Sequence, residues 1–131
     1  MRKYIYASYI LWVLGAVILG IVSKNYYALL MTYKESLIDA LGLAVREVFG
    51  NNLEYYLTPC RKREIADVRM MSFLLLRQKG MSFQEIGRTL GKHHTSVIYG
   101  VRQAEAHIQY DKRFRHDYTQ LKKAFQKFIA Q

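Results

Sequence analysis

The chain has 131 residues, enough for one modest domain, and it carries a formal net charge of +10. Residues 1–57 hold five Lys/Arg and four Asp/Glu, a net of +1, whereas residues 58–131 hold fifteen and six, a net of +9. The basic half therefore favours a polyanionic partner, of which nucleic acid is the commonest. The single cysteine, Cys60, excludes an intramolecular disulfide, which suits a reducing compartment.

The stretch from Tyr4 to Ser23 contains no charged residue and is long enough to span a bilayer as a helix. Three tyrosines and Trp12 lie toward its N-terminal end, as interfacial aromatics do. Two interpretations of residues 1–30 stay open. They form an apolar helix that anchors a cytoplasmic protein to the inner membrane, or they are an extension that is not made because translation starts at Met31.

Residues 31–57 are interpreted as an accessory helix and a connection. The amphipathic pattern predicts a helix from Thr32 to Val48, which Gly50 ends as a C-terminal cap. Its apolar stripe comprises Leu37, Leu41, Ala44, Val45 and Val48. Asn51 to Thr58 is predicted to be a short connection whose apolar side chains face inward.

A long core helix is predicted next. Thr58-Pro59 is typical of a helix start, and the helix is expected to become regular near Arg63 and to run to about Gln78. Its buried side is expected to comprise Ile65, Val68, Met70, Met71, Leu74 and Leu75.

Two short helices joined by a tight turn follow. Ser82 and Glu85 form a capping box, after which Phe83, Ile86 and Leu90 fall on one helix face. Gly91 suits the end of this helix, and a second periodic set, Val97, Ile98 and Val101, begins six residues later. The residues between are all polar. This is the plan of a helix-turn-helix, whose second helix reads base edges in the major groove with its first turn.

The last helix is predicted from an N-cap at Asp111 to about Ala130. Its apolar positions are Phe114, Tyr118, Leu121, Phe125 and Phe128. Its other faces are basic, which indicates either a solvated surface or contacts to a nucleic-acid backbone. The predicted fold is all-α, a small helical bundle with a helix-turn-helix, preceded by an apolar N-terminal helix.

The run Ser82-x-x-Glu85-Ile86-Gly87-x-x-Leu90-Gly91-Lys92-x-His94-Thr95-Ser96-Val97 resembles the C-terminal DNA-binding domain of the bacterial replication initiator DnaA. Upstream, Arg61 to Ile65 and Arg69 look like the basic loop and long helix that open that domain. The resemblance extends from about Leu37 to Ile108. It implies that residues 58–131 form an initiator-like helix-turn-helix DNA-binding domain.

The candidate base-reading residues are Lys92, His93, His94, Thr95 and Ser96. Lysine donates to guanine or to a phosphate, imidazole donates to N7 or O6, and threonine bonds a base or lays its methyl group on thymine. The family typically has Arg-Asp-His-Thr-Thr here, so His93 stands where aspartate is usual. The replacement is expected to change the preference at one base pair, by about 1–3 kcal/mol.

The resemblance also implies roles for three arginines. Arg61 and Arg63 match the basic loop, in which an arginine enters the minor groove, and Arg69 matches an arginine near the phosphates. The N-terminus of the helix that Ser82 caps is a predicted phosphate contact, because its first N–H groups are unpaired.

No catalytic, cofactor or metal site is predicted. The four histidines and one cysteine lack a zinc-site spacing, and the Gly-x-x-x-x-Gly-Lys-Ser/Thr loop of an ATPase is missing. We therefore expect a stand-alone, non-enzymatic protein that binds double-stranded DNA sequence-specifically, in replication initiation or its regulation. The alternative is a membrane-tethered module for protein interaction or transcriptional regulation. The sequence identifies no protein partner.

Overall fold

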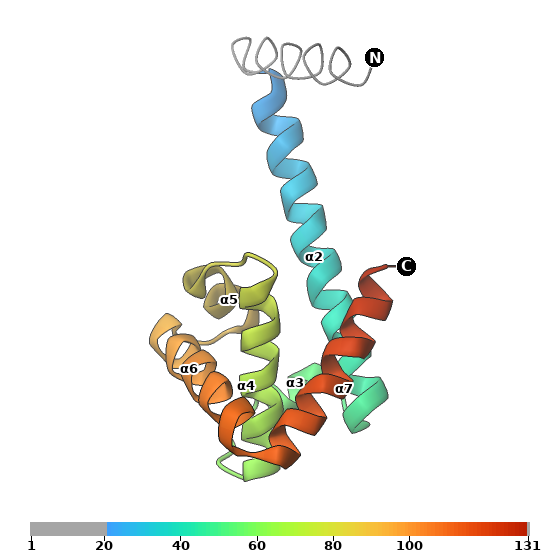
Figure 1. The fold of residues 1–131 in the computed structure, drawn as a ribbon. Coiled ribbons are helices and arrows are strands. Elements are labelled where there is room, and N and C mark those ends of the chain that lie inside the picture. The colour runs from blue at the N-terminus through green and yellow to red at the C-terminus, as the bar shows by residue number, and fades with distance from the viewer. Residues whose placement is uncertain (1–20, 131) are drawn as a thin grey trace. The chain divides into compact units, whose positions relative to one another are not determined.

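The computed structural model describes residues 21–130, which contain six helices and no strand. The helices are α2 (Ile21–Phe49), α3 (Leu53–Leu57), α4 (Arg63–Gln78), α5 (Phe83–Leu90), α6 (His94–Tyr110) and α7 (Lys112–Ile129), as Figure 1 shows. The prediction of an all-α fold is confirmed. The predicted membrane segment, Tyr4 to Ser23, lies outside the described residues except for its last three. Within the described range, no helix is both long enough and apolar enough to cross a bilayer.

Helix α2 begins at Ile21, well before the predicted start at Thr32. No glycine or proline lies within residues 21–31, and Ala, Leu and Met at positions 28–31 favour a helix. Nothing in this stretch therefore prevents the helix from beginning before Thr32. Contacts along the chain separate two compact units at Ser36, and from Leu37 onward α2 belongs to the second unit. In that unit four members of the predicted stripe, Leu37, Leu41, Ala44 and Val45, are buried.

The predicted connection contains a short helix, α3. Tyr56 is buried there, and its hydroxyl donates to the Phe49 carbonyl at 3.0 Å. Thr58 caps the C-terminal end of α3, with its hydroxyl donating to the Tyr55 carbonyl at 2.7 Å. The prediction that Thr58-Pro59 starts the next helix is therefore wrong. Residues 58–62 form a loop instead, and the hydrogen bonds that hold this loop come from a distant side chain described below.

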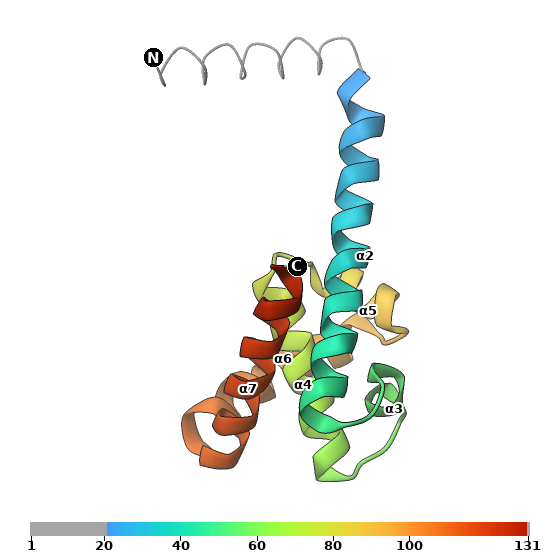
Figure 2. The same ribbon diagram turned by 90° about the vertical axis from the view of Figure 1, so that its right-hand side faces the viewer.

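Helix α4 occupies the bounds expected for the core helix and lies at the centre of the second unit in both views (Figures 1 and 2). Its buried residues include the unpredicted Phe73 and Leu76, while Met70 is only half-buried. Helix α6 packs closely against α4. Gly100 permits this approach, because a Cβ atom there would lie 2.7 Å from Cδ2 of Phe73.

Helix α7 has the predicted cap, since the Asp111 carboxylate accepts the N–H groups of Arg113 at 3.0 Å and Phe114 at 3.2 Å. Phe114, Tyr118, Leu121 and Phe125 are buried. The Tyr118 hydroxyl donates to Oε1 of Gln78 at 2.8 Å, which joins α7 to the C-terminal end of α4. Burial raises the pKa of this phenol, so it remains a neutral donor.

Candidate nucleic-acid interface

The predicted helix-turn-helix is formed by α5, a three-residue turn and α6. Oγ of Ser82 accepts the Glu85 N–H at 3.1 Å, as the capping box requires. Ile86 and Leu90 are buried, and Gly91 ends α5 with φ 68° and ψ 34°, a left-handed conformation that favours glycine. The local sequence therefore sets both where α5 stops and the direction in which the chain leaves it.

The first turn of α6 is capped by a histidine. Nδ1 of His93 lies 3.3 Å from the Thr95 backbone N and 2.7 Å from the Thr95 hydroxyl oxygen. Because a backbone N–H only donates, Nδ1 is the acceptor, and the neutral ring carries its hydrogen on Nε2. An aspartate at this position would also accept, but it would have no N–H to donate outward.

The polar residues predicted to read bases lie at this end of α6. His93, His94, Thr95 and Ser96 are exposed, and Lys92 is half-buried. The His93 and His94 rings lie with their centroids 4.4 Å apart and their planes tilted by 34°. No group of three or more potential ligands in the described range could hold a metal ion. These four exposed residues, His93 to Ser96, carry hydrogen-bond donors and acceptors, and we call them the reading turn.

The three predicted arginines have different surroundings. Arg61 is exposed in the loop before α4, and no carboxylate of the described residues pairs with it. Arg63 pairs with Asp111, and its Nε lies 3.7 Å from a carboxylate oxygen of Asp67. Asp111 follows the C-terminal end of α6, about 25 Å along that helix from the reading turn. The structure thus brings Arg63 to the far end of α6.

Arg69 binds the loop that carries Arg61. Its Nε donates to the Tyr56 carbonyl at 3.1 Å, and its Nη2 donates to the carbonyls of Thr58 and Cys60, each at 2.8 Å. A single guanidinium therefore binds one carbonyl at the end of α3 and two carbonyls of the loop that follows it. These bonds fix the loop against α4.

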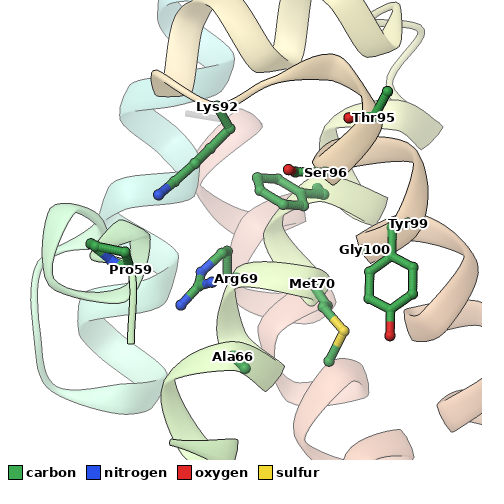
Figure 3. Close-up of a pocket in the computed structure, with 10 residues that line it drawn as sticks. Pro59, Ala66, Arg69, Met70, Lys92, Thr95, Ser96, Tyr99 and Gly100 are labelled. Atoms are coloured by element: carbon green, nitrogen blue, oxygen red, sulfur yellow. The ribbon is translucent and has the colours of Figure 1, made fainter. Parts of the chain in front are cut away.

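A hollow of about 530 Å³ separates this loop from the reading turn. Figure 3 shows Lys92 and Arg69 reaching into it from the turn and from α4, with Pro59 on one side and Tyr99 on the other. Thr95 and Ser96 also line it. We call this space the loop–turn hollow.

Tyr99 was not predicted as a functional residue, although its signal was present in the sequence. It lies four residues after Thr95 and three after Ser96, a spacing that places all three on one helix face. The structure leaves Tyr99 66% exposed. Its partner on the opposite wall, Pro59, comes from a loop whose course no local pattern predicted.

The family described as "Bacterial dnaA protein helix-turn-helix" matches residues 38–104. Chromosomal replication initiator protein DnaA of Thermomicrobium roseum is 38% identical over 87 residues, which is 64% of this chain and 19% of that protein. The proteins of the same name from a Jannaschia species and from Mycoplasma genitalium are 31% identical over 107 residues and 35% identical over 74 residues.

The Jannaschia match covers 71% of this chain and 22% of its relative, and the Mycoplasma match covers 56% and 17%. The chain thus spans about a fifth of the length of these curated relatives. The matched region contains the long core helix, the basic loop and the whole of the reading turn. The chain belongs to the bacterial DnaA helix-turn-helix family.

Proposed function

We propose that this protein binds double-stranded DNA sequence-specifically, with the reading turn of α6 in the major groove. The proposal depends on one observation. His93, His94, Thr95 and Ser96 are exposed at the N-terminal end of α6, a helix that packs against α4. Hydroxyl and imidazole groups are suited to the donor and acceptor pattern of base edges. The net charge of +9 on residues 58–131 supplies the attraction to phosphate.

Arg61 is the arginine we assign to the adjacent minor groove. It is exposed, and the loop that carries it is held by Arg69 on the other side of the loop–turn hollow from the reading turn. The narrow minor groove has a negative potential that attracts arginine. Arg63 is less suited to this role, because Asp67 and Asp111 already neutralise it.

The proposed biological role is in replication initiation or its regulation, in the cytoplasm and without ATP hydrolysis by these residues. The relatives are named as chromosomal replication initiators, and the shared region is the helix-turn-helix. The alternative, a membrane-tethered module in which the same helical bundle binds a protein partner or regulates transcription, stays a separate prediction, because most of the predicted membrane segment lies outside the described residues.

The test is a selection from random duplexes by the full chain, followed by affinity measurement on the enriched sequence. We expect one motif to be enriched, and we expect His94→Ala and Thr95→Ala to lose that preference while their helical circular dichroism is unchanged. Each lost base contact should cost about 1–3 kcal/mol of discrimination. If the selection with the unmodified chain enriches no motif, the chain does not bind DNA sequence-specifically.

A further inference from the structure

Helix α7 has an exposed surface of one charge sign. Its only acidic residue, Asp117, is half-buried, and none of its exposed side chains is apolar. The exposed cations of α7 are Lys112, Arg113, Arg115, Lys122, Lys123 and Lys127. Exposed helices commonly intersperse both signs of charge, because opposite charges four residues apart attract each other. The surface of α7 therefore differs from an ordinary solvated helix face.

These charges do not stabilise the helix that carries them. Lys112, Arg113 and Arg115 lie in its first turn, where the helix dipole favours anions and no acidic residue is present. Lys123 and Lys127 lie four residues apart, a spacing at which like charges repel. The N-cap and the buried aromatic side chains stabilise α7 instead, so the positive charge has another explanation.

Three of the cations have other contacts. Arg115 donates to two carbonyls at the C-terminal end of α6, at 2.7 and 2.9 Å, and Lys127 pairs with Glu47 at 2.7 Å. Arg113 lines a separate cavity together with Asp117. None of the carboxylates in residues 21–130 forms an ion pair with the other three cations, which we call the lysine face of α7: Lys112, Lys122 and Lys123.

The lysine face and the reading turn lie on different sides of the second compact unit. The buried side of α7, from Phe114 to Phe125, faces the core, and the helical period places Lys112 and Lys123 on the opposite side. Figure 1 shows α4 between α6 and α7, and the inner face of α6 packs against α4. Because duplex DNA is stiff over about 150 base pairs, one short segment does not contact both surfaces without a sharp bend.

The chemistry of the lysine face is suited to a nucleic-acid backbone. Lys112 and Lys123 are separated by about 16 Å along the helix, a length that lies beside about nine phosphate charges of a duplex. A single small anion would meet only part of this line. Protein interfaces depend on buried aromatic and apolar anchors, which the exposed surface of α7 lacks. Both comparisons favour a long polyanion over a small anion or a protein.

We propose that the lysine face binds the sugar–phosphate backbone of a second DNA segment, so that one chain holds two segments together. This rests on the proposed function, which assigns the first segment to the reading turn. Phosphate contacts carry no sequence information, so the second segment does not require a motif. The chain therefore bridges a selected site to any neighbouring duplex.

Capture of a second duplex tests the bridge. The selected duplex is fixed to beads, the full chain is bound to it below saturation, and a fluorescent duplex of unrelated sequence is added. We expect the unmodified chain to retain the fluorescent duplex on the beads. We also expect retention to fall steeply as the salt concentration rises, because each phosphate contact releases counterions.

Substitution of two lysines separates the effect of charge from that of folding. Lys122→Gln combined with Lys123→Gln should lower retention about tenfold and reduce the salt slope of capture by about 1.8, the value for two lost phosphate contacts. Lys122→Arg combined with Lys123→Arg keeps both charges and should retain as much duplex as the unmodified chain. Arg113→Gln removes a charge from another side of α7 and should change retention by less than about twofold. Each variant should keep its helical circular dichroism and bind the selected duplex alone with an affinity within about threefold of the unmodified chain.

Four results would overturn the bridge. The unmodified chain, bound to the selected duplex, retains no second duplex, or the double glutamine variant retains as much as the unmodified chain. Retention only of a second duplex that carries the motif would mean that two reading turns hold the two duplexes. Release by polyglutamate as readily as by DNA of equal charge would assign the lysine face to an acidic protein. A chain that selects no motif at all overturns the proposed function, which is a different failure.

Discussion

The carbonyl oxygen of Lys92 lies 2.5 Å from the position that a Cβ atom would occupy on Gly87. The Lys92 N–H also donates to the Gly87 carbonyl at 2.7 Å, so the turn is both bonded to α5 and pressed against it. A side chain at Gly87 would meet backbone, which cannot rotate away. Because Gly87 has no side chain, the backbone of the turn between α5 and α6 can lie this close to α5.

Gly87→Ala should therefore displace the turn. We expect a loss of stability of about 1–3 kcal/mol from overpacking, together with weaker DNA binding, measured by chemical denaturation and by fluorescence anisotropy. Gly42→Ala in α2 is the matched control, because a Cβ atom there meets nothing within 4 Å. That substitution should stabilise the helix slightly. Equal behaviour of the two variants would mean that the turn does not need the close approach.

His93 should have separable roles in capping and in reading. His93→Ala removes the acceptor for the Thr95 N–H and should cost about 0.5–1 kcal/mol of stability, measured by thermal melting. His93→Asp keeps an acceptor at the cap and should melt near the unmodified chain. The same aspartate should shift the selected motif at one base pair, toward a base that donates, such as cytosine. An unchanged motif would place His93 outside the reading surface.

Arg69→Lys should loosen the loop without changing the net charge. Lysine lacks the planar fork that reaches the carbonyls of Tyr56, Thr58 and Cys60 together. We expect trypsin to cleave after Arg61 and Lys62 several times faster than in the unmodified chain, as followed by mass spectrometry. Arg102→Lys, at an exposed position on α6, is the control. Unchanged cleavage after Arg61 would show that other contacts hold the loop.

Asp111 should make the stability depend on pH. The Phe114 N–H is the main cause that lowers the pKa of this carboxyl, and the Arg113 N–H and the Arg63 guanidinium act in the same direction. Because the pKa is lower in the folded chain, the carboxylate stabilises the fold above its ordinary pKa of about 3.9, and this is lost as the pH falls through the lowered value. Asp111→Ala should lower the melting temperature at neutral pH, and the difference should narrow below about pH 4. Asp39→Ala, at an exposed carboxylate of α2, is the control for lost charge, and it should leave the melting temperature at neutral pH nearly unchanged.

Helix ends could be predicted from the sequence where a capping residue lies at the end itself. Ser82, Gly91 and Asp111 each act on backbone groups within a few residues, so α5, the turn and the start of α7 were predicted correctly. Thr58-Pro59 carries a similar local signal, but there the outcome depends on Arg69, which binds the loop from α4. Local patterns do not contain that information.

The candidate site shows the same division. The position of the exposed polar residues at the start of α6 followed from the periodicity of the apolar residues. The contacts that each arginine makes could not be predicted in this way. Arg63 finds its partner 48 residues away at Asp111, and Arg69 finds backbone carbonyls, which have no sequence signature. The loop–turn hollow likewise depends on bringing Pro59 and Tyr99 to opposite walls, a consequence of the packing of α6 against α4.

The orientation of the protein on DNA can be measured directly by following backbone amide resonances during titration with the selected duplex. If α6 enters the major groove and the loop of residues 58–62 enters the adjacent minor groove, the largest chemical-shift changes should fall on residues 92–99 and on Arg61 and Lys62. The amides along the buried face of α4 should change little. Shifts confined to α2 and α7, with residues 92–96 unaffected, would contradict recognition by this helix.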